Sequence, residues 1–425
     1  MRTSFIIRAA VASLTLGTAA CSTSPTAIPT PNVNIVEGPT ADVTPRWNAL
    51  ARSLIVTAKP NQQEALRALA YLSLAQHQAA AEISGRPNGD GPISANLTIQ
   101  DRQETGIVSE DGLANRVDRA AQLRGAIAGA SEKILEEMFK ANVTDVLAAA
   151  ASEAVLSAEA GEIASEFEAG REVGRNIGVR LVTAARGDRF DAPWNGTVPT
   201  GPGVWFSSIG RAPLLPTLGQ MRPFYMTTGA DFRPAPPPAY GTGAFTAALN
   251  EIRAFSDTRT PAQDSIAKFW AMATGTLAAG YWNEVATSLI AKYRLTEARA
   301  AHLLALMNTA AMDGNIACHD AKYTYWVVRP SQADQGIKTA IGLPNHPSYP
   351  SNHSCLSGTA AFVLGAELPA ERAEMERQAT EATESRYYAG LHYRFDGEAG
   401  LAIAKRVAEL ALRVDRELGG KLVVR

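Results

Sequence analysis

The sequence predicts an all-α protein with two helical bundles joined by a Pro-rich irregular segment. Apolar residues recur at helical spacing over most of the 425 residues, whereas alternating strand patterns followed by hairpin turns are almost absent. Prolines crowd one internal stretch, where a long helix cannot form. With 46% apolar and 19% charged residues, the chain can bury a substantial core and is not globally disordered.

The N-terminus has the features of an export signal. Residues 1–20 place two arginines before a short apolar stretch that ends in small residues, as in a secretory signal peptide. Cys21 follows directly, so the segment resembles a bacterial lipobox in which Thr18 replaces the usual leucine. Residues 21–45 are rich in Pro, Thr and Ser, which predicts a disordered tether. We expect an exported protein, periplasmic or anchored to the outer membrane through lipidated Cys21; ordinary cleavage beside an incidental cysteine is the alternative.

The N-terminal bundle is predicted over residues 46–186. Amphipathic stretches run over 62–83, 111–140, 143–159 and 161–185. The segment 187–243 contains ten prolines together with several Trp, Phe and Tyr residues. Because so many apolar rings are unusual in a disordered linker, we expect an ordered irregular segment that packs over the helices and walls a pocket.

The C-terminal bundle is predicted over residues 244–420. Its helices are expected at 244–257, 262–292, 295–328, 352–365, 368–386 and 396–418. Four of the six histidines lie between His319 and His392, which points to a functional site in this bundle.

Composition excludes several classes of protein. The formal net charge is −2 and no stretch concentrates Lys and Arg, so no nucleic-acid partner is expected. Beyond the N-terminus no apolar run reaches the ~18–20 residues that span a bilayer, so membrane contact is expected only through the lipid anchor. Three cysteines cannot build a disulfide scaffold.

The first of three motifs in the C-terminal bundle pairs Lys322 with Arg329. Seven residues apart, they would share one face of a helix that ends at Pro330. Taken alone, this pair is better explained as a solvated cationic stripe.

The second motif is Ser351-Asn352-His353 at the start of a helix rich in small residues. Ser351 or Asn352 suits the N-cap, which leaves backbone N–H groups and the positive end of the helix dipole for an anion. A structural cap beside an incidental histidine is the alternative.

The third motif joins Ser385-Arg386 to His392 and Asp396. A carboxylate four residues after a histidine can hold one ring nitrogen and leave the other as nucleophile or ligand. An ordinary helix contact is the alternative.

Together the motifs supply what a tetrahedral oxyanion requires, namely cations, backbone amides and two histidines on either side of the central atom. The order Lys-x6-Arg-Pro, Pro-Ser-x-His and Ser-Arg-x5-His-x3-Asp resembles the superfamily of type 2 phosphatidic acid phosphatases, bacterial acid phosphatases and vanadium haloperoxidases. The family usually has glycine where Asn352 stands, a change that alters the shape of the pocket.

Other segments extend this resemblance to the soluble, bacterial haloperoxidase-like branch. They include Gly203-Val204-Trp205, Arg222-Pro223-Phe224 and Phe269-Trp270, so that the resemblance covers residues 60–420. It implies two helical bundles with the active site in the C-terminal one, and an enzyme that acts on small molecules.

The resemblance implies two activities for one site. In a haloperoxidase, His392 would ligate a vanadate cofactor for the peroxide-dependent oxidation of halide, with His353 as the acid–base group. In an acid phosphatase, which needs no cofactor, His392 would attack the phosphoester to form a phosphohistidine and His353 would protonate the leaving oxygen. Asp396 would orient His392 in both. The oxyanion would be held by Lys322, Arg329, Ser351, Asn352 and Arg386.

Some alternatives stay open. A non-catalytic lipoprotein that only binds oxyanions would have to lack the nucleophile or the acid, and both are present. His319 and His346 are candidates for lining the pocket, although structural roles explain both of them better. Cys318 and Cys355 remain as an even pair in an oxidising compartment, and two motifs that meet at one anion would bring them together. We therefore expect a disulfide, with two buried thiols as the alternative.

Overall fold

The computed structural model describes residues 41–85, 110–272 and 275–422. Within these ranges the regular elements are thirteen α-helices and three short 3-10 helices, with a single isolated bridge between Val204 and Val327. The predicted all-α fold is confirmed. The predicted signal peptide, Cys21 and the tether up to residue 40 lie outside the described residues.

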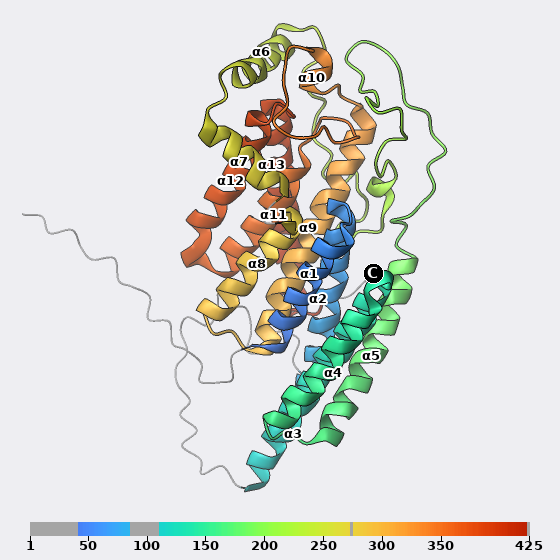
Figure 1. Ribbon diagram of the computed structural model, residues 1–425, viewed down its shortest axis with the longest axis vertical. Coiled ribbons are helices and arrows are strands. Elements are labelled where there is room, and N and C mark those ends of the chain that lie inside the picture. The colour runs from blue at the N-terminus through green and yellow to red at the C-terminus, as the bar shows by residue number, and fades with distance from the viewer. Residues whose placement is uncertain (1–40, 86–109, 273–274, 423–425) are drawn as a thin grey trace, which may run out of the picture. The chain divides into compact units, whose positions relative to one another are not determined.

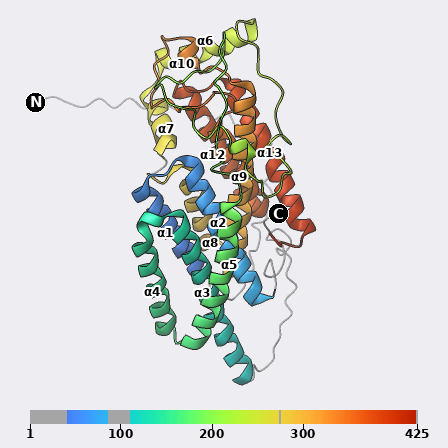
Figure 2. The ribbon, with the colours of Figure 1, turned by 90° about the vertical axis from the view of Figure 1, so that its right-hand side faces the viewer.

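The N-terminal helices are α1 (Val43–Ala58), α2 (Gln62–Ser84), α3 (Glu110–Met138), α4 (Val143–Glu159) and α5 (Ala164–Arg186). Helix α1 starts inside the segment predicted as tether, because Val43 and Trp47 are buried. A capping box formed by Asn61 and Glu64 fixes the start of α2. Helices α3, α4 and α5 lie side by side (Figures 1 and 2), and α3 approaches α5 closely at Gly125 and Gly174.

The irregular segment between α5 and α6 is ordered. It contains one 3-10 turn, η2 (Leu218–Gln220), and runs along the C-terminal helices (Figure 1). The buried carboxylate of Asp313, in α9, accepts hydrogen bonds from the backbone N–H groups of Phe224, Tyr225 and Met226 at 2.7, 2.8 and 3.1 Å. This one side chain fastens the middle of the segment to the bundle.

The C-terminal elements are α6 (Gly243–Thr258), α7 (Pro261–Met272), α8 (Leu277–Lys292), α9 (Glu297–Tyr325), α10 (Pro330–Ala333), α11 (Asn352–Glu367), η4 (Pro369–Glu371), α12 (Arg372–Tyr388) and α13 (Arg394–Glu417). Two expectations are corrected. The stretch 262–292 forms two helices, because the chain turns at Gly275 with φ 90°. Helix α9 ends at Tyr325 rather than 328, because Trp326 adopts a left-handed conformation.

Helix α9 is the central element of the fold. Almost every residue from Ala300 to Lys322 is buried, as expected for a helix covered on all sides. Helices α2, α11 and α13 pack against it. A buried amide chain, in which Asn48 of α1 donates to Asn283 of α8 and Asn283 donates to Asn308 of α9 at 2.8 Å each, joins the N-terminal helices to the C-terminal ones.

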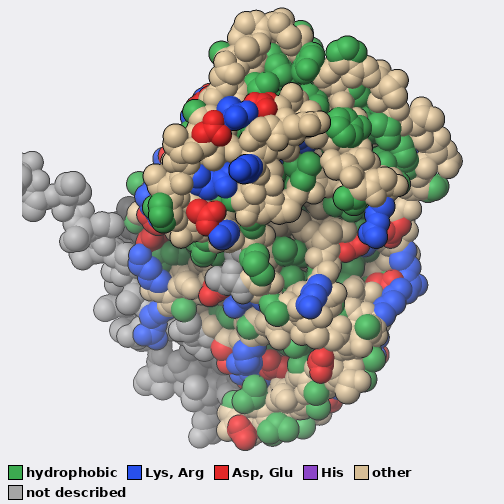
Figure 3. Space-filling model, turned by 45° about the horizontal axis from the view of Figure 1, so that its top comes forward, with side chains coloured by type: hydrophobic (Ala, Val, Ile, Leu, Met, Phe, Trp, Pro, Cys, Tyr) green, Lys and Arg blue, Asp and Glu red, His purple; other side chains and the backbone are tan. Residues whose placement is uncertain are grey.

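The described surface carries charges of both signs. On the face in Figure 3, basic and acidic side chains lie close to one another, in agreement with the small net charge. Among the described helices, none combines the length and apolar character that crossing a membrane requires.

Candidate functional site

The three motifs converge on one region of the C-terminal helices. Lys322 lies near the end of α9, Asn352 and His353 open α11, Arg386 lies near the end of α12, and His392 precedes α13. Arg329 does not share a helix with Lys322, contrary to the prediction, because α9 ends between them and Arg329 lies in the extended chain that leads into α10.

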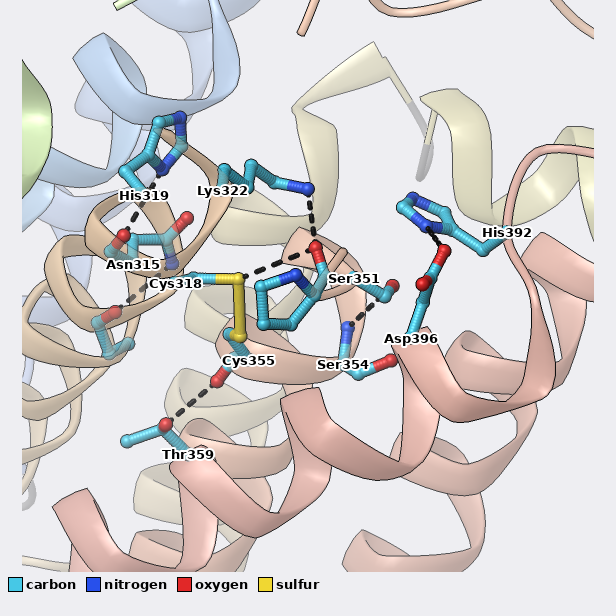
Figure 4. The surroundings of a disulfide bond; sticks show 12 residues. Asn315, Cys318, His319, Lys322, Ser351, Ser354, Cys355, Thr359, His392 and Asp396 are labelled. Atoms are coloured by element: carbon cyan, nitrogen blue, oxygen red, sulfur yellow. Dashed lines mark hydrogen bonds and ion pairs between the residues drawn. A yellow bond between two sulfur atoms is a disulfide. The ribbon is translucent and has the colours of Figure 1, made fainter. Parts of the chain in front are cut away.

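His392 and Asp396 form a buried pair. The carboxylate Oδ2 of Asp396 accepts hydrogen bonds from His392 Nδ1 at 2.8 Å, Tyr393 N at 3.1 Å and Ser348 Oγ at 2.5 Å. Burial raises the pKa of Asp396 to about 6, against the hydrogen bonds from Ser348 and Tyr393 and the nearby cations, which lower it. Burial holds the pKa of His392 well below its usual value. The neutral ring therefore carries its proton on Nδ1 and keeps a lone pair on Nε2 (Figure 4).

Arg329 lies directly at that lone pair. One terminal nitrogen of its guanidinium donates hydrogen bonds to His392 Nε2 and to the carbonyl of Leu391, at 3.0 Å each. The other terminal nitrogen is 3.1 Å from His346 Nδ1. Burial lowers the pKa of Arg329 to about 10, which leaves the group charged at neutral pH. A buried cation thus donates to the lone pair of His392 Nε2, and a group that binds at Nε2 must displace this hydrogen bond.

Lys322 is engaged with the loop before α11. Its ammonium donates to the carbonyls of Pro347 at 2.9 Å and Ser348 at 2.8 Å, and also to the carbonyl of Pro350 (Figure 4). An ammonium has three donors, so in this conformation none is left for an oxyanion. Lys322 acts here as a clamp on the loop that supplies Ser348 to Asp396.

The start of α11 supplies the second motif. Ser351 is the N-cap, and its hydroxyl accepts from Ser354 N at 3.4 Å. The amide of Asn352 is buried, and neither its nitrogen nor its oxygen has a partner among the described residues. His353 Nε2 lies 2.9 Å from the carbonyl of Trp270, which places the proton on Nε2 and the lone pair on Nδ1. Burial lowers the pKa of His353 to about 3.

Arg386 is a second buried guanidinium. It donates to Ser385 Oγ and to the carbonyl of Ala267, at 2.8 Å each. Burial lowers its pKa to about 9, so it stays charged at neutral pH. Neither Arg329 nor Arg386 forms an ion pair with an acidic side chain of the described chain. Two buried cations without an acidic partner favour an anion.

A cavity of about 510 Å³ opens onto this site. Of the predicted residues, those that line it are His346, Asn352, His353, Arg386 and His392. Lys322, Arg329, Ser351 and Asp396 lie behind this wall. Of the two candidate lining histidines, His346 reaches the cavity, whereas His319 is fully buried and its Nδ1 bonds the carbonyl of Asn315 at 3.1 Å.

Cys318 and Cys355 form a disulfide, with Cα atoms 6.4 Å apart. The bond joins α9 to α11 one turn before Lys322 and two residues after His353 (Figure 4). It therefore ties together the two helices that carry the first two motifs.

Sequence reasoning missed three residues at the site. Ser348 donates to Asp396, the carbonyl of Trp270 faces His353, and Gln62 of α2 lines the cavity. Ser348 is three residues before Ser351 of the second motif, and this proximity could have marked it as a site residue. Tertiary packing brings Trp270 and Gln62 to the site, and no sequence motif marks either residue.

The comparisons with known proteins match part of the chain to one superfamily. Residues 301–418 match the PAP2 superfamily. A non-specific acid phosphatase from Providencia stuartii is 28% identical over 117 residues, which are 26% of this chain and 47% of that enzyme. The chain thus spans about half the length of this relative.

Solved structures share the fold over most of the chain. A bacterial vanadium-dependent iodoperoxidase superposes with a TM-score of 0.65 at 21% identity, covering 88% of this chain and 96% of that one. A bacterial vanadium-dependent chloroperoxidase in its holo form gives a TM-score of 0.64 at 13% identity, covering 85% and 93%. The predicted resemblance is confirmed, and the relatives named here are an acid phosphatase and vanadium-dependent peroxidases.

Proposed function

For this chain, which carries a PAP2 superfamily domain within a haloperoxidase-like fold, we propose a vanadate-dependent enzyme that oxidises halide with peroxide. The observation that carries the proposal is the reacting nitrogen of His392. Asp396, at the other ring nitrogen, keeps the lone pair of His392 on Nε2, where it accepts a hydrogen bond from Arg329 at the wall of the cavity. The fold shared with vanadium-dependent peroxidases over most of the chain supports this activity in preference to others.

The residues present fit vanadate. His392 Nε2 offers the single nitrogen ligand, and Arg329 and Arg386 offer positive charge that forms no ion pair with an acidic side chain of the described chain. The unpartnered amide of Asn352, beside the N-terminus of α11, offers a donor to an oxyanion. When bound, vanadate supplies the activation of peroxide towards halide.

The protein residues perform the remaining tasks. Asp396 holds the proton on Nδ1 of His392, so that Nε2 would be the nitrogen that holds vanadate. Arg329 and Arg386 balance the charge of the oxyanion in a water-poor site. His353, neutral in the anion-free protein, can accept a proton at Nδ1 once an anion nearby raises its pKa.

Acid phosphatase activity is the second candidate, supported by the sequence match to the Providencia stuartii enzyme. The same lone pair on His392 would attack phosphorus, forming an N–P bond as the P–O bond to the leaving group breaks. The leaving oxygen would take a proton from His353, and water would then release phosphate from the phosphohistidine.

One side-by-side assay tests the proposal. The purified protein is assayed for halide oxidation with vanadate and peroxide, and for phosphoester hydrolysis without vanadate. Halide oxidation that requires vanadate supports the first function, and hydrolysis alone supports the second. If both assays are negative although vanadate binds, the protein is a non-catalytic oxyanion binder and the proposal is wrong.

His353→Ala refines this test. Because His353 transfers protons rather than holding charge, we expect turnover to fall at least tenfold while vanadate affinity changes little. An equal loss in affinity and turnover would contradict that role.

We also propose export with lipidation at Cys21, supported by the order of the first 21 residues and by the disulfide, which suits an oxidising compartment. Cell fractionation of the parent and of Cys21→Ala tests the anchor. If both proteins are equally soluble in the periplasm, the anchor does not exist.

A further inference from the structure

The cavity is much larger than an oxyanion. Its volume of about 510 Å³ falls in the range typical of sites for organic ligands, whereas one water takes about 30 Å³ of the liquid. Beyond the histidines and Arg386, most of its wall is apolar. The apolar lining residues include Leu214, Ala271, Met272, Ile341, Leu356 and Leu391. They come from the irregular segment, from α7 and α11, and from the loops before α11 and α13.

The N-terminal bundle contributes Asn61, Gln62 and Gln63 to this wall, and Gln62 brings a buried donor without a partner in the described part of the chain. Gln62, the first residue of α2, lines the cavity. Its side-chain oxygen accepts a hydrogen bond from the backbone N–H of Ala278 at 3.0 Å, which fixes the orientation of the amide. The amide nitrogen is buried and has no partner among the described residues. A buried donor without a partner is rare in proteins and calls for an acceptor.

We propose that this cavity binds the organic part of the substrate, and that the amide of Gln62 selects substrates by a hydrogen bond to that part. The ligand has an apolar body and one hydrogen-bond acceptor, such as a carbonyl, ether or hydroxyl oxygen, which meets the amide nitrogen of Gln62. The inference rests on the proposed function for the oxyanion site beside it. In a haloperoxidase the apolar body belongs to a separate neutral molecule, and in a phosphatase it is the alcohol part of the ester.

Binding of phosphonates to the full-length, vanadate-free protein tests the apolar part, because their C–P bond resists hydrolysis. Calorimetry compares inorganic phosphate, methylphosphonate and phenylphosphonate. We expect phenylphosphonate to bind about tenfold more tightly than methylphosphonate, since the ring adds buried apolar area. Equal affinities would overturn the inference while leaving the oxyanion site intact. Failure of phosphate itself to bind would refute the proposed function and the inference with it.

Filling the cavity provides a second arm. Ala271→Phe should abolish the advantage of phenylphosphonate and leave the phosphate affinity within about twofold. Because Ala271 is partly buried, Met272→Trp at the exposed rim serves as a variant with little risk to folding. Val155→Trp on α4, exposed and outside the cavity, is the matched control. If both cavity variants keep the parental preference, the apolar body binds elsewhere and the inference is wrong.

The role of Gln62 is tested with the three acetylphenylphosphonate isomers. We expect at least one isomer to bind roughly threefold to tenfold more tightly than phenylphosphonate, the range of one net hydrogen bond. Gln62→Leu should remove this gain without changing phenylphosphonate binding. Gln78→Leu is the control, because this glutamine is also on α2 but bonds the carbonyl of Leu422. No gain for any isomer would exclude Gln62 as a selecting residue.

A last arm distinguishes the two kinds of ligand. Acetophenone is titrated into phosphate-saturated protein and followed by ligand-observed NMR. Binding together with phosphate indicates a separate neutral substrate. If acetophenone does not bind to the phosphate-saturated protein and phosphonates compete with phosphate, the apolar body belongs to an ester.

Discussion

Replacing Asp396 by asparagine removes the group that sets the state of His392. The carboxylate accepts the Nδ1 proton of His392 at 2.8 Å and is fully buried. An asparagine amide can instead donate to Nδ1, which would move the ring proton to Nε2 and remove the lone pair from the reacting nitrogen.

The size of the effect follows from the lost contact. A hydrogen bond to a charged group contributes about 1.5–3 kcal/mol, and about 1.4 kcal/mol corresponds to a tenfold change in rate. The lost bond alone therefore predicts a decrease of about 10–10²-fold in turnover. Moving the proton adds to this, so we expect Asp396→Asn to lower turnover by at least roughly 10²-fold.

Turnover is measured for the parent and the variants with whichever of the two activities the parent shows. The melting temperature of each protein shows whether it is folded in the assay. Asp415→Asn is the matched control, because Asp415 forms a buried pair with His302 at 2.7 Å but does not line the cavity. We expect the control to keep its turnover while folded. If Asp396→Asn keeps turnover within twofold of the parent, Asp396 does not orient the reacting histidine.

Three further predictions concern stability. Asp313→Ala should lower the free energy of unfolding by roughly 3 kcal/mol, because it leaves three backbone N–H groups without an acceptor. Urea unfolding measures this difference, and a change below about 1 kcal/mol would contradict the prediction. Replacing Cys318 and Cys355 by serine should lower the free energy of unfolding by about 4 kcal/mol, given the sequence separation of 37, and should weaken phosphate binding. If the free energy of unfolding and the phosphate affinity are both unchanged, the disulfide contributes to neither. Burial lowers the pKa values of His77 and His319 to about 3, so the unfolded chain takes up protons below about pH 6.5 while the folded state does not. The free energy of unfolding should therefore decrease from pH 6.5 towards pH 3, and equal stability at pH 6.5 and 4.5 would be the contrary result.

The helices were predictable where periodicity and capping agree. The range of α2 follows from its apolar spacing and from Asn61 as N-cap. The end of α9 was not predictable, because Trp326 adopts the left-handed conformation without a glycine to mark the turn, and its ring packs against Trp194 and Trp205, which are distant in sequence. The placement of Arg329 on a separate segment follows from that same turn.

The site was predictable as a set of residues but not as a geometry. Sequence spacing could pair His392 with Asp396, since four residues separate them. It could not show that Lys322 gives all its donors to the loop before α11, because that loop folds back through contacts distant in sequence. Gln62 lies 291 positions before His353, and only the packing of the two bundles brings both to one cavity.

Vanadate binding to the parent and to His392→Ala tests the central claim most directly, because vanadate is the proposed cofactor of a haloperoxidase and an oxyanion that the phosphatase site would also bind. His302→Ala, which removes a buried histidine outside the cavity, controls for general effects on folding. We predict that the parent and the control bind one vanadate per chain and that His392→Ala binds it at least tenfold more weakly. Equal affinity in the parent and in folded His392→Ala would contradict the assignment of His392 Nε2 as the nitrogen that holds the oxyanion.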